Sequence, residues 1–260
     1  MELRRENVTR YIMPLREGGS LPALAEAEDD FKYVVKFRGA GHGVKALIAE
    51  LIGGEIARTL GLRVPELVFL NLDEAFGQTE GDEEIQDLLQ ASRGLNLGLH
   101  FLSGALTFDP VVNRMDEELA SQIVWLDALL TNVDRTVKNT NMLVWHNDVW
   151  LIDHGASLFF HYSWVNWEKH AVSPFIQIKD HTLLAKASRL KEVDIAYKQR
   201  LTPEKIREIV QLIPDDWLQW ADLDEEPQLI RDVYYRFLTE RTAHSEIFIK
   251  EAEYARKASL

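Results

Sequence analysis

The feature that most constrains the fold of this chain is a predicted helix, loop and strand hairpin between residues 117 and 155. Apolar residues recur at helical spacing over 117–131, which predicts an amphipathic helix. Two short apolar segments follow at 142–145 and 149–152, and Asn147-Asp148 between them is typical of a tight turn. We therefore predict one compact helix–loop–hairpin unit in this part of the chain.

Carboxylate and amide side chains flank the predicted hairpin. Asp134 and Asn139 lie in the loop before it, Asn141 directly precedes its first strand, and Asp153 follows its second strand. Phosphoryl transfer from ATP needs this set, because one carboxylate orients the attacking hydroxyl while a second carboxylate and an amide oxygen hold Mg²⁺ against the phosphates. Each group alone is more typical of a loop ion pair, a turn or a cap, but their combination on one unit favours a catalytic site.

The spacing within this unit also matches a catalytic signature. Asp134 and Asn139 have the spacing of the aspartate and asparagine in the kinase catalytic loop. Asp153-His154-Gly155 stands where kinases have Asp-Phe-Gly. The acidic residues and the amides therefore occupy positions that this chemistry requires.

The first third of the chain is predicted to contain strands and one main helix. Residues 31–37 are rich in β-branched and aromatic side chains and predict a strand. The glycines of 38–43 mark a loop, and the apolar spacing of 44–60 predicts a helix that Gly61 would cap. Residues 64–70 predict a further strand.

The rest of the chain is predicted to be mostly helical. Residues 82–89 favour a short exposed helix, and we interpret 94–101 as the joint between two lobes. Thr202-Pro203 is typical of a helix start. A single long amphipathic helix is expected from Glu226 to about Lys257.

Composition excludes several classes of function. The 260 residues include 29 Lys and Arg against 42 Asp and Glu, and this net charge of −13 argues against a broad nucleic-acid-binding surface. The absence of Cys excludes a disulfide framework, a Cys-ligated zinc site and a Cys nucleophile. No apolar run is long enough to span a bilayer, and the first seven residues are not typical of a secretory signal, so a soluble cytoplasmic protein is expected.

The motifs as a set resemble one known family. Segments 125–135, 139–143 and 151–155, extended by 34–37 and 49–65, resemble the HipA-like kinases, in particular compact bacterial members with little beyond the kinase core. This family is related to the phosphatidylinositol kinases and the protein kinases in fold.

The resemblance implies both a fold and an activity. It implies an α+β, two-lobed protein-kinase-like fold, with a sheet-based N-lobe over residues 1–97 and a mainly helical C-lobe over 98–260. It implies transfer of the γ-phosphate of ATP, with Mg²⁺, to a Ser or Thr hydroxyl of a protein, including the enzyme itself. A toxin-type role with an antitoxin partner is implied as well. The net charge and the lack of a membrane-spanning apolar run separately predict no direct contact to nucleic acid or membrane.

The resemblance also assigns roles to individual residues. Lys36 matches the lysine that holds the α- and β-phosphates, and Glu50 matches the helix glutamate that pairs with it. Glu55 is a competitor, but Glu50 fits the family spacing better. Asp134 matches the catalytic aspartate that orients the hydroxyl and accepts its proton late in the transfer.

The metal ligands follow in the same way. Asp153 matches the metal-binding aspartate. For the second ligand, Asn139 fits the spacing from Asp134, whereas Asn141 directly precedes the strand, as the ligand asparagine does in this fold. Asn141 is slightly favoured and both are kept.

Further expectations concern the nucleotide and the acceptor. Gly18-Gly19-Ser20 lies between the first two strands, where glycines let backbone N–H groups approach phosphates, and Ser20 is an autophosphorylation candidate by resemblance. Adenine is expected against the predicted joint, near Gly98, His100 and Phe101. The acceptor is expected against the aromatic-rich residues 155–182, although packing of those aromatics on the helical lobe is an alternative.

Other interpretations of the same residues stay open. A small-molecule or lipid kinase of this fold would share the Asp-Arg pair. A non-catalytic pseudokinase that acts as a binding module is less consistent with intact Lys36, Glu50, Asp134 and Asp153. Transfer of AMP in place of phosphate is a further alternative on the same fold.

Overall fold

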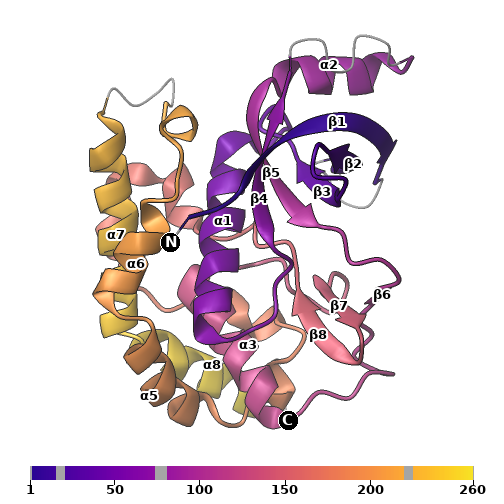
Figure 1. Ribbon diagram of the computed structural model, residues 1–260. Coiled ribbons are helices and arrows are strands. Elements are labelled where there is room, and N and C mark those ends of the chain that lie inside the picture. Colours follow the sequence, from indigo (N-terminus) through magenta and orange to yellow (C-terminus); the bar gives the residue numbers. More distant parts are fainter. Residues whose placement is uncertain (1, 16–20, 74–80, 220–224, 260) are drawn as a thin grey trace.

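The computed structural model describes residues 2–15, 21–73, 81–219 and 225–259. In this part of the chain, helix α1 (Gly43–Leu60) lies between a barrel of strands and a group of helices (Figure 1). A small separate sheet lies below the barrel in the same view.

The barrel is formed by strands from the first hundred residues. They are β1 (Arg5–Pro14), β2 (Ala23–Ala27), β3 (Lys32–Lys36), β4 (Leu67–Leu72) and β5 (Gly94–His100). Their order is β1-β2-β3-β5-β4, and a parallel pairing of β1 with β4 closes the barrel. Successive side chains of a strand point to opposite faces. Tyr33 and Val35 of β3 are therefore buried in the barrel interior, whereas Val34 and Lys36 face α1.

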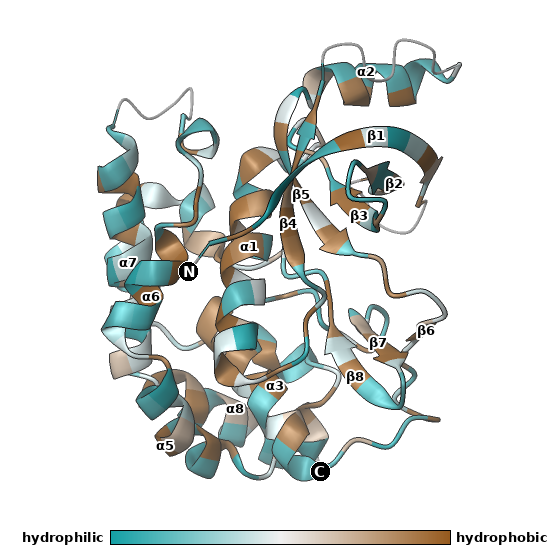
Figure 2. Cartoon of the chain, in the orientation of Figure 1, coloured by the Kyte–Doolittle hydropathy of each residue, from teal (hydrophilic) through white to brown (hydrophobic). Residues whose placement is uncertain are grey.

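Two helices belong to this part of the chain, and both were predicted. Helix α1 is buried along most of its length, and Figure 2 colours many of its residues as hydrophobic. It ends at Gly61, whose φ of 91° lies in the left-handed region that favours glycine. Helix α2 (Glu83–Ala91) begins at Asp82, whose carboxylate accepts the backbone N–H groups of Glu84 and Ile85.

The second half of the chain is mainly helical, as predicted. Its helices are α3 (Glu117–Leu130), α4 (Trp167–Ala171), α5 (Leu190–Arg200), α6 (Pro203–Val210), α7 (Pro227–Ala243) and α8 (Glu246–Ser259). Helix α3 is central, because its buried Trp125 makes edge-on contacts with Tyr197 of α5 and Phe248 of α8. Among the described helices, none has both the length and the hydropathy to cross a bilayer.

The predicted hairpin is confirmed. Strands β7 (Met142–Trp145) and β8 (Asp148–Leu151) pair antiparallel, and β6 (Leu106–Thr107) adds a third strand. The turn residues are His146 and Asn147, with φ of 50° and 65°, so Asp148 is already in β8 and not in the turn.

Two of the predicted segments are wrong. Residues 94–100 are not a joint but strand β5, which pairs with both β3 and β4 because its alternating apolar side chains fit the barrel. The single helix expected from Glu226 to about Lys257 is two helices, α7 and α8, with a break at His244 and the fully buried Ser245. The break redirects the chain, so that Phe248 of α8 packs against α3.

A buried histidine anchors residues after the hairpin to α7. The His161 ring is fully buried, and its Nδ1 lies 3.0 Å from the Tyr234 hydroxyl oxygen. Burial, with a smaller contribution from Lys45, lowers the pKa of His161 to about 3. The native protein therefore keeps this ring neutral in the pH range where the unfolded chain protonates it.

We expect this histidine to make the protein less stable in mild acid. Since the unfolded-state pKa is about 6.5, only the unfolded chain binds this proton between pH 6.5 and about 3, so stability falls as pH falls. At pH 5 the loss from this residue is about 2 kcal/mol. Urea unfolding at pH 7 and pH 5 checks it. The His161→Phe variant should lose less stability than wild type between these two pH values, and equal losses would contradict the expectation.

Candidate functional site

Three charged side chains from distant parts of the chain meet where β3, α1 and the end of the β7–β8 hairpin come together. The Lys36 Nζ lies 2.6 Å from Glu50 Oε2 and 2.5 Å from Asp153 Oδ1. Glu50 is fully buried, whereas the Asp153 side chain is 45% exposed. The lysine therefore links α1 to the end of the β7–β8 hairpin. Glu55, the competitor for this pairing, instead lies 3.4 Å from Arg58.

The electrostatics of this cluster favour the charged forms. Burial lowers the pKa of Lys36, but the nearby Glu50 and Asp153 carboxylates more than compensate and leave it raised. Burial raises the pKa of Glu50, but Lys36 and then His154 outweigh this effect and lower it to about 2. A charged Lys–Glu pair whose glutamate is buried and whose lysine borders a hollow, with a half-exposed carboxylate beside it, is suited to an anionic ligand and its cation.

The second predicted carboxylate, Asp134, is held by two amides. Asn139 donates its Nδ2–H to Asp134 Oδ2 at 2.7 Å, and Asn141 donates to the same oxygen at 3.0 Å. The backbone N–H of Asp134 donates to Asn132 Oδ1 at 3.1 Å. Because both asparagines use their amide nitrogens for Asp134, their amide oxygens are the atoms that can ligate a cation. Both candidates for the second metal ligand therefore contact the predicted catalytic aspartate.

Both ends of the hairpin have an uncommon backbone conformation. Asn141, directly before β7, has φ of 47°, and Asp153, two residues after β8, has φ of 58°. Non-glycine residues seldom occupy this left-handed region, although Asn and Asp tolerate it best. The backbone N–H of Ile152 donates to the Asn141 carbonyl at 3.1 Å and joins these ends. Strained residues of this kind cluster at functional sites.

A buried ion pair lies beneath the loop that carries Asp134. Arg135 Nε lies 2.6 Å from Asp127 Oδ2, and both side chains are fully buried. The Arg135 guanidinium also donates to the carbonyls of Asn141 and Ile152. His181 Nε2 lies 2.9 Å from the same Asp127 oxygen. This network ties the loop to α3, to the hairpin and to residue 181.

Sequence reasoning assigned no role to Asp127 or His181. A signal for Asp127 was present, because it lies four residues after Ile123 and thus on the apolar side of the predicted helix. An acid at such a position is rarely buried without a partner. No comparable local signal marks His181, whose contact with α3 spans 54 residues.

Two hollows meet at the hairpin end. The first is lined by Lys36, Asp134 and the first turn of α1, and the second by Thr107–Val111 and by Asn141–Leu143. Asn139 and Asp153 line both hollows. Two of the polar side chains predicted from the sequence, Asn139 and Asp153, therefore lie between the two hollows.

Two of the residues predicted to contact the nucleotide point away from Lys36. Gly98 and His100 lie on the face of β5 opposite Leu97, the cross-strand neighbour of Lys36. The Gly98 Cα faces Leu70, and the His100 ring packs edge-on against Tyr33, so these side-chain positions point to the barrel interior. For Gly98 and His100, the prediction that remains is a contact between their backbone groups and a nucleotide.

The other predicted nucleotide contacts are placed as follows. Phe101 directly follows β5, and its backbone N–H donates to the Lys32 carbonyl. Gly18, Gly19 and Ser20 lie outside the described residues.

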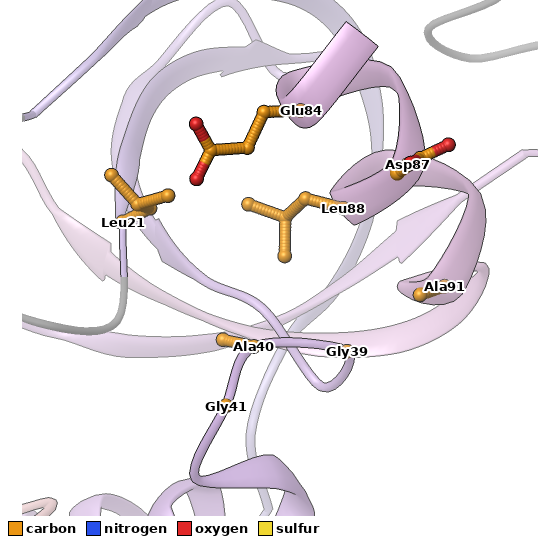
Figure 3. Close-up of a pocket in the computed structure, with 8 residues that line it drawn as sticks. All are labelled: Leu21, Gly39, Ala40, Gly41, Glu84, Asp87, Leu88 and Ala91. Carbon is orange, nitrogen blue, oxygen red and sulfur yellow. The ribbon is translucent and has the colours of Figure 1, made fainter.

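A further hollow borders the glycine-rich turn between β3 and α1 (Figure 3). It shares Ala40 with the first hollow of the site. Its walls come from Leu21, the turn and α2, and the Glu84 side chain points into it while Asp87 points away. Among the described residues with a predicted role, none lines this hollow.

The donor set fits magnesium better than a transition metal. Within the described ranges, no group of three or more His, Cys, Asp and Glu side chains is arranged to hold a metal ion. Mg²⁺ is commonly bound by one or two carboxylates together with substrate phosphates. Asp153 with an asparagine amide oxygen matches that pattern of hard oxygen ligands.

We expect the substitution Gly53→Ala to disturb this site. A Cβ at Gly53 would lie 2.6 Å from the His154 Cβ, a rigid atom of the residue after Asp153. Alanine favours a helix interior over glycine by about 1 kcal/mol, but overpacking costs typically about 1–3 kcal/mol. A lower Tm and a lower turnover are the expected result. Gly41→Ala, where a Cβ meets no atom within 4 Å, is the control; a Gly53→Ala Tm above wild type would contradict the expectation.

Comparisons with known proteins agree with this geometry. A family model described as HipA-like kinase matches residues 8–246. The crystal structure of a Helicobacter pylori proinflammatory kinase, CtkA, is similar to this chain, with a TM-score of 0.55 and 14% identity over 99% of each chain, a likeness that concerns the fold alone. No curated protein matches. Because the family model spans most of the sequence, the chain belongs to the HipA-like kinase family.

Proposed function

We propose that this protein transfers the γ-phosphate of ATP to a hydroxyl group in a Mg²⁺-dependent reaction. Family membership supports a phosphotransferase activity. The observation that carries the proposal is the contact of Lys36 with both Glu50 and Asp153, next to the Asp134 carboxylate held by Asn139 and Asn141. Phosphoryl transfer is catalysed mainly by positioning and electrostatic stabilisation, which these groups can supply.

Each residue has a role in this proposal. Lys36, held by Glu50, binds the α- and β-phosphates and offsets part of their charge. Asp134 orients the acceptor hydroxyl and takes its proton late in the transfer. Its two amide partners limit the rotation of the carboxylate, so one oxygen stays directed at the acceptor. The γ-phosphoryl group moves between the two hollows that share Asn139 and Asp153.

Asp153 and one asparagine are the residues that would hold Mg²⁺, which when bound neutralises charge on the β- and γ-phosphates. Asn141 is the better candidate, because it is buried and its backbone carbonyl accepts from the N–H of Ile152, the residue next to Asp153. Asn139 is exposed and lies in the preceding loop. The lobe boundary predicted between residues 97 and 98 falls inside β5, so in the proposed two-lobed arrangement the chain divides after His100, where that strand ends.

We further propose a Ser or Thr of a protein as acceptor, bound near residues 155–182. Exposed apolar side chains of this segment, including Tyr162, Val165 and Ile176, support a macromolecular acceptor. Self-phosphorylation and an antitoxin-type partner stay proposals from the family resemblance.

Labelled nucleotide tests the reaction directly. The protein is incubated with Mg²⁺ and either γ-labelled or α-labelled ATP, in parallel with Asp153→Ala. Label from the γ position alone, lost in the variant, is expected. Label from the α position would indicate AMP transfer, and nucleotide binding by calorimetry without any transfer would indicate a pseudokinase. Absence of binding would overturn the ATP-based proposal.

A further inference from the structure

Besides Lys36 of β3, one lysine near the site, Lys45 of α1, has no role in the proposed reaction. Lys45 lies in the first turn of α1, and its Nζ donates to the His161 carbonyl oxygen at 2.9 Å. The same Nζ lies 5.6 Å from the centroid of the Tyr162 ring. Since α1 also carries Glu50, Lys45 connects the helix of the Lys36–Glu50 pair to the 3-10 turn Phe159–Tyr162.

The turn that receives this contact is firmly anchored. Phe160 stacks on Phe237 of α7, with 4.0 Å between ring centroids, and His161 contacts the Tyr234 hydroxyl at 3.0 Å. Both Phe160 and His161 are buried. A hydrogen bond to this backbone carbonyl therefore fixes Lys45 relative to α7 rather than to a loose loop.

Helix α1 contacts the residues after Asp153 at two further positions along its length. A Cβ on Gly155 would lie 3.6 Å from the Ala46 carbonyl oxygen, and Gly53 lies against His154. Lys45 precedes Glu50 by five residues, about 7.5 Å along the helix axis. A tilt of the first turn would therefore shift the Glu50 carboxylate relative to the Lys36 Nζ.

We propose that Lys45 is a positioning residue, which holds α1 against the segment after Asp153 and so keeps Glu50 in place on Lys36. This inference rests on the proposed function.

Three substitutions test the role of Lys45. Lys45→Met keeps the apolar stem but loses the N–H donors, Lys45→Arg retains a donor, and Lys191→Met changes an exposed lysine of α5 that pairs with Glu253. A small misplacement of catalytic groups lowers rates by roughly 10- to 100-fold. We expect a loss of kcat of that size for Lys45→Met, substantial rescue by Lys45→Arg and no change for Lys191→Met.

The double variant Lys45→Met/Glu50→Gln tests whether Lys45 acts on the reaction through Glu50. If Lys45 acts through Glu50, the double variant is no slower than Glu50→Gln alone, whereas multiplied losses would overturn the proposal. Hydrogen exchange gives a readout independent of activity: the backbone amides of 47–51 should exchange faster in Lys45→Met than in Lys191→Met. If wild type transfers no phosphate but this exchange difference is present, the proposed function fails and the positioning role stands. Equal exchange overturns the positioning role.

Discussion

The substitution Asp134→Asn is expected to lower kcat for phosphoryl transfer by about 100- to 10,000-fold, the usual contribution of a positioned general base. An amide has nearly the same shape as the carboxylate, and its oxygen can still accept from Asn139 and Asn141. It cannot accept the hydroxyl proton, so the loss should appear in kcat with little change in ATP affinity. Steady-state kinetics with thermal shift by ATP and Mg²⁺ measure both quantities.

Asp148→Asn is the matched control for this substitution. Asp148 is an aspartate of the neighbouring β7–β8 hairpin, paired with Arg63 at 3.0 Å, but it lines neither hollow of the site. Its turnover should stay close to that of wild type. An Asp134→Asn enzyme as active as this control would show that Asp134 is not the base, and the role would have to be reassigned.

The substitution Arg135→Met is expected to be the most destabilising of those considered, by about 3–5 kcal/mol. It leaves the Asp127 carboxylate buried without its guanidinium partner, and breaking a buried ion pair by removing one member has a cost of about this size. Arg135 holds the pKa of Asp127 below its usual range against a burial effect that raises it, with His181 as a further contributor. Urea unfolding at neutral pH measures the change in free energy.

Two comparisons show whether the loss of stability comes from leaving a buried charge unpaired or from removing any arginine. Arg63→Met breaks a pair whose side chains are both about half exposed, and such pairs contribute about 1 kcal/mol or less. The double variant Asp127→Asn/Arg135→Met removes both buried charges and should recover part of the stability. If Arg135→Met and Arg63→Met unfold at similar urea concentrations, the buried pair does not stabilise the fold as argued.

Local patterns predicted those elements whose determinants lie close together in sequence. Helix α1 with its Gly61 cap, the β7–β8 hairpin and the Thr202 start of α6 agree with the structure, because periodicity and capping are local properties. The strand predicted over 31–37 agrees with β3, in which Lys36 lies on the face opposite Val35.

Segments whose structure depends on partners distant in the sequence were harder to interpret. The apolar alternation of 94–100 does not say which strands it will join, and β5 was mistaken for a joint between lobes. The charged residues from 226 onward continue a helical pattern across His244, and only the packing of Phe248 on α3 requires the break.

By itself the sequence determined which residues could carry the chemistry: a lysine on a strand, two aspartates around one hairpin and two nearby amides. The tertiary structure decided which of them meet. Lys36 contacts Asp153 across 117 residues and selects Glu50 rather than Glu55, and Asp127 acquires Arg135 and His181 as partners. The reason is physical, because a local pattern specifies the face on which a side chain lies, whereas the partner on that face depends on how separate elements pack.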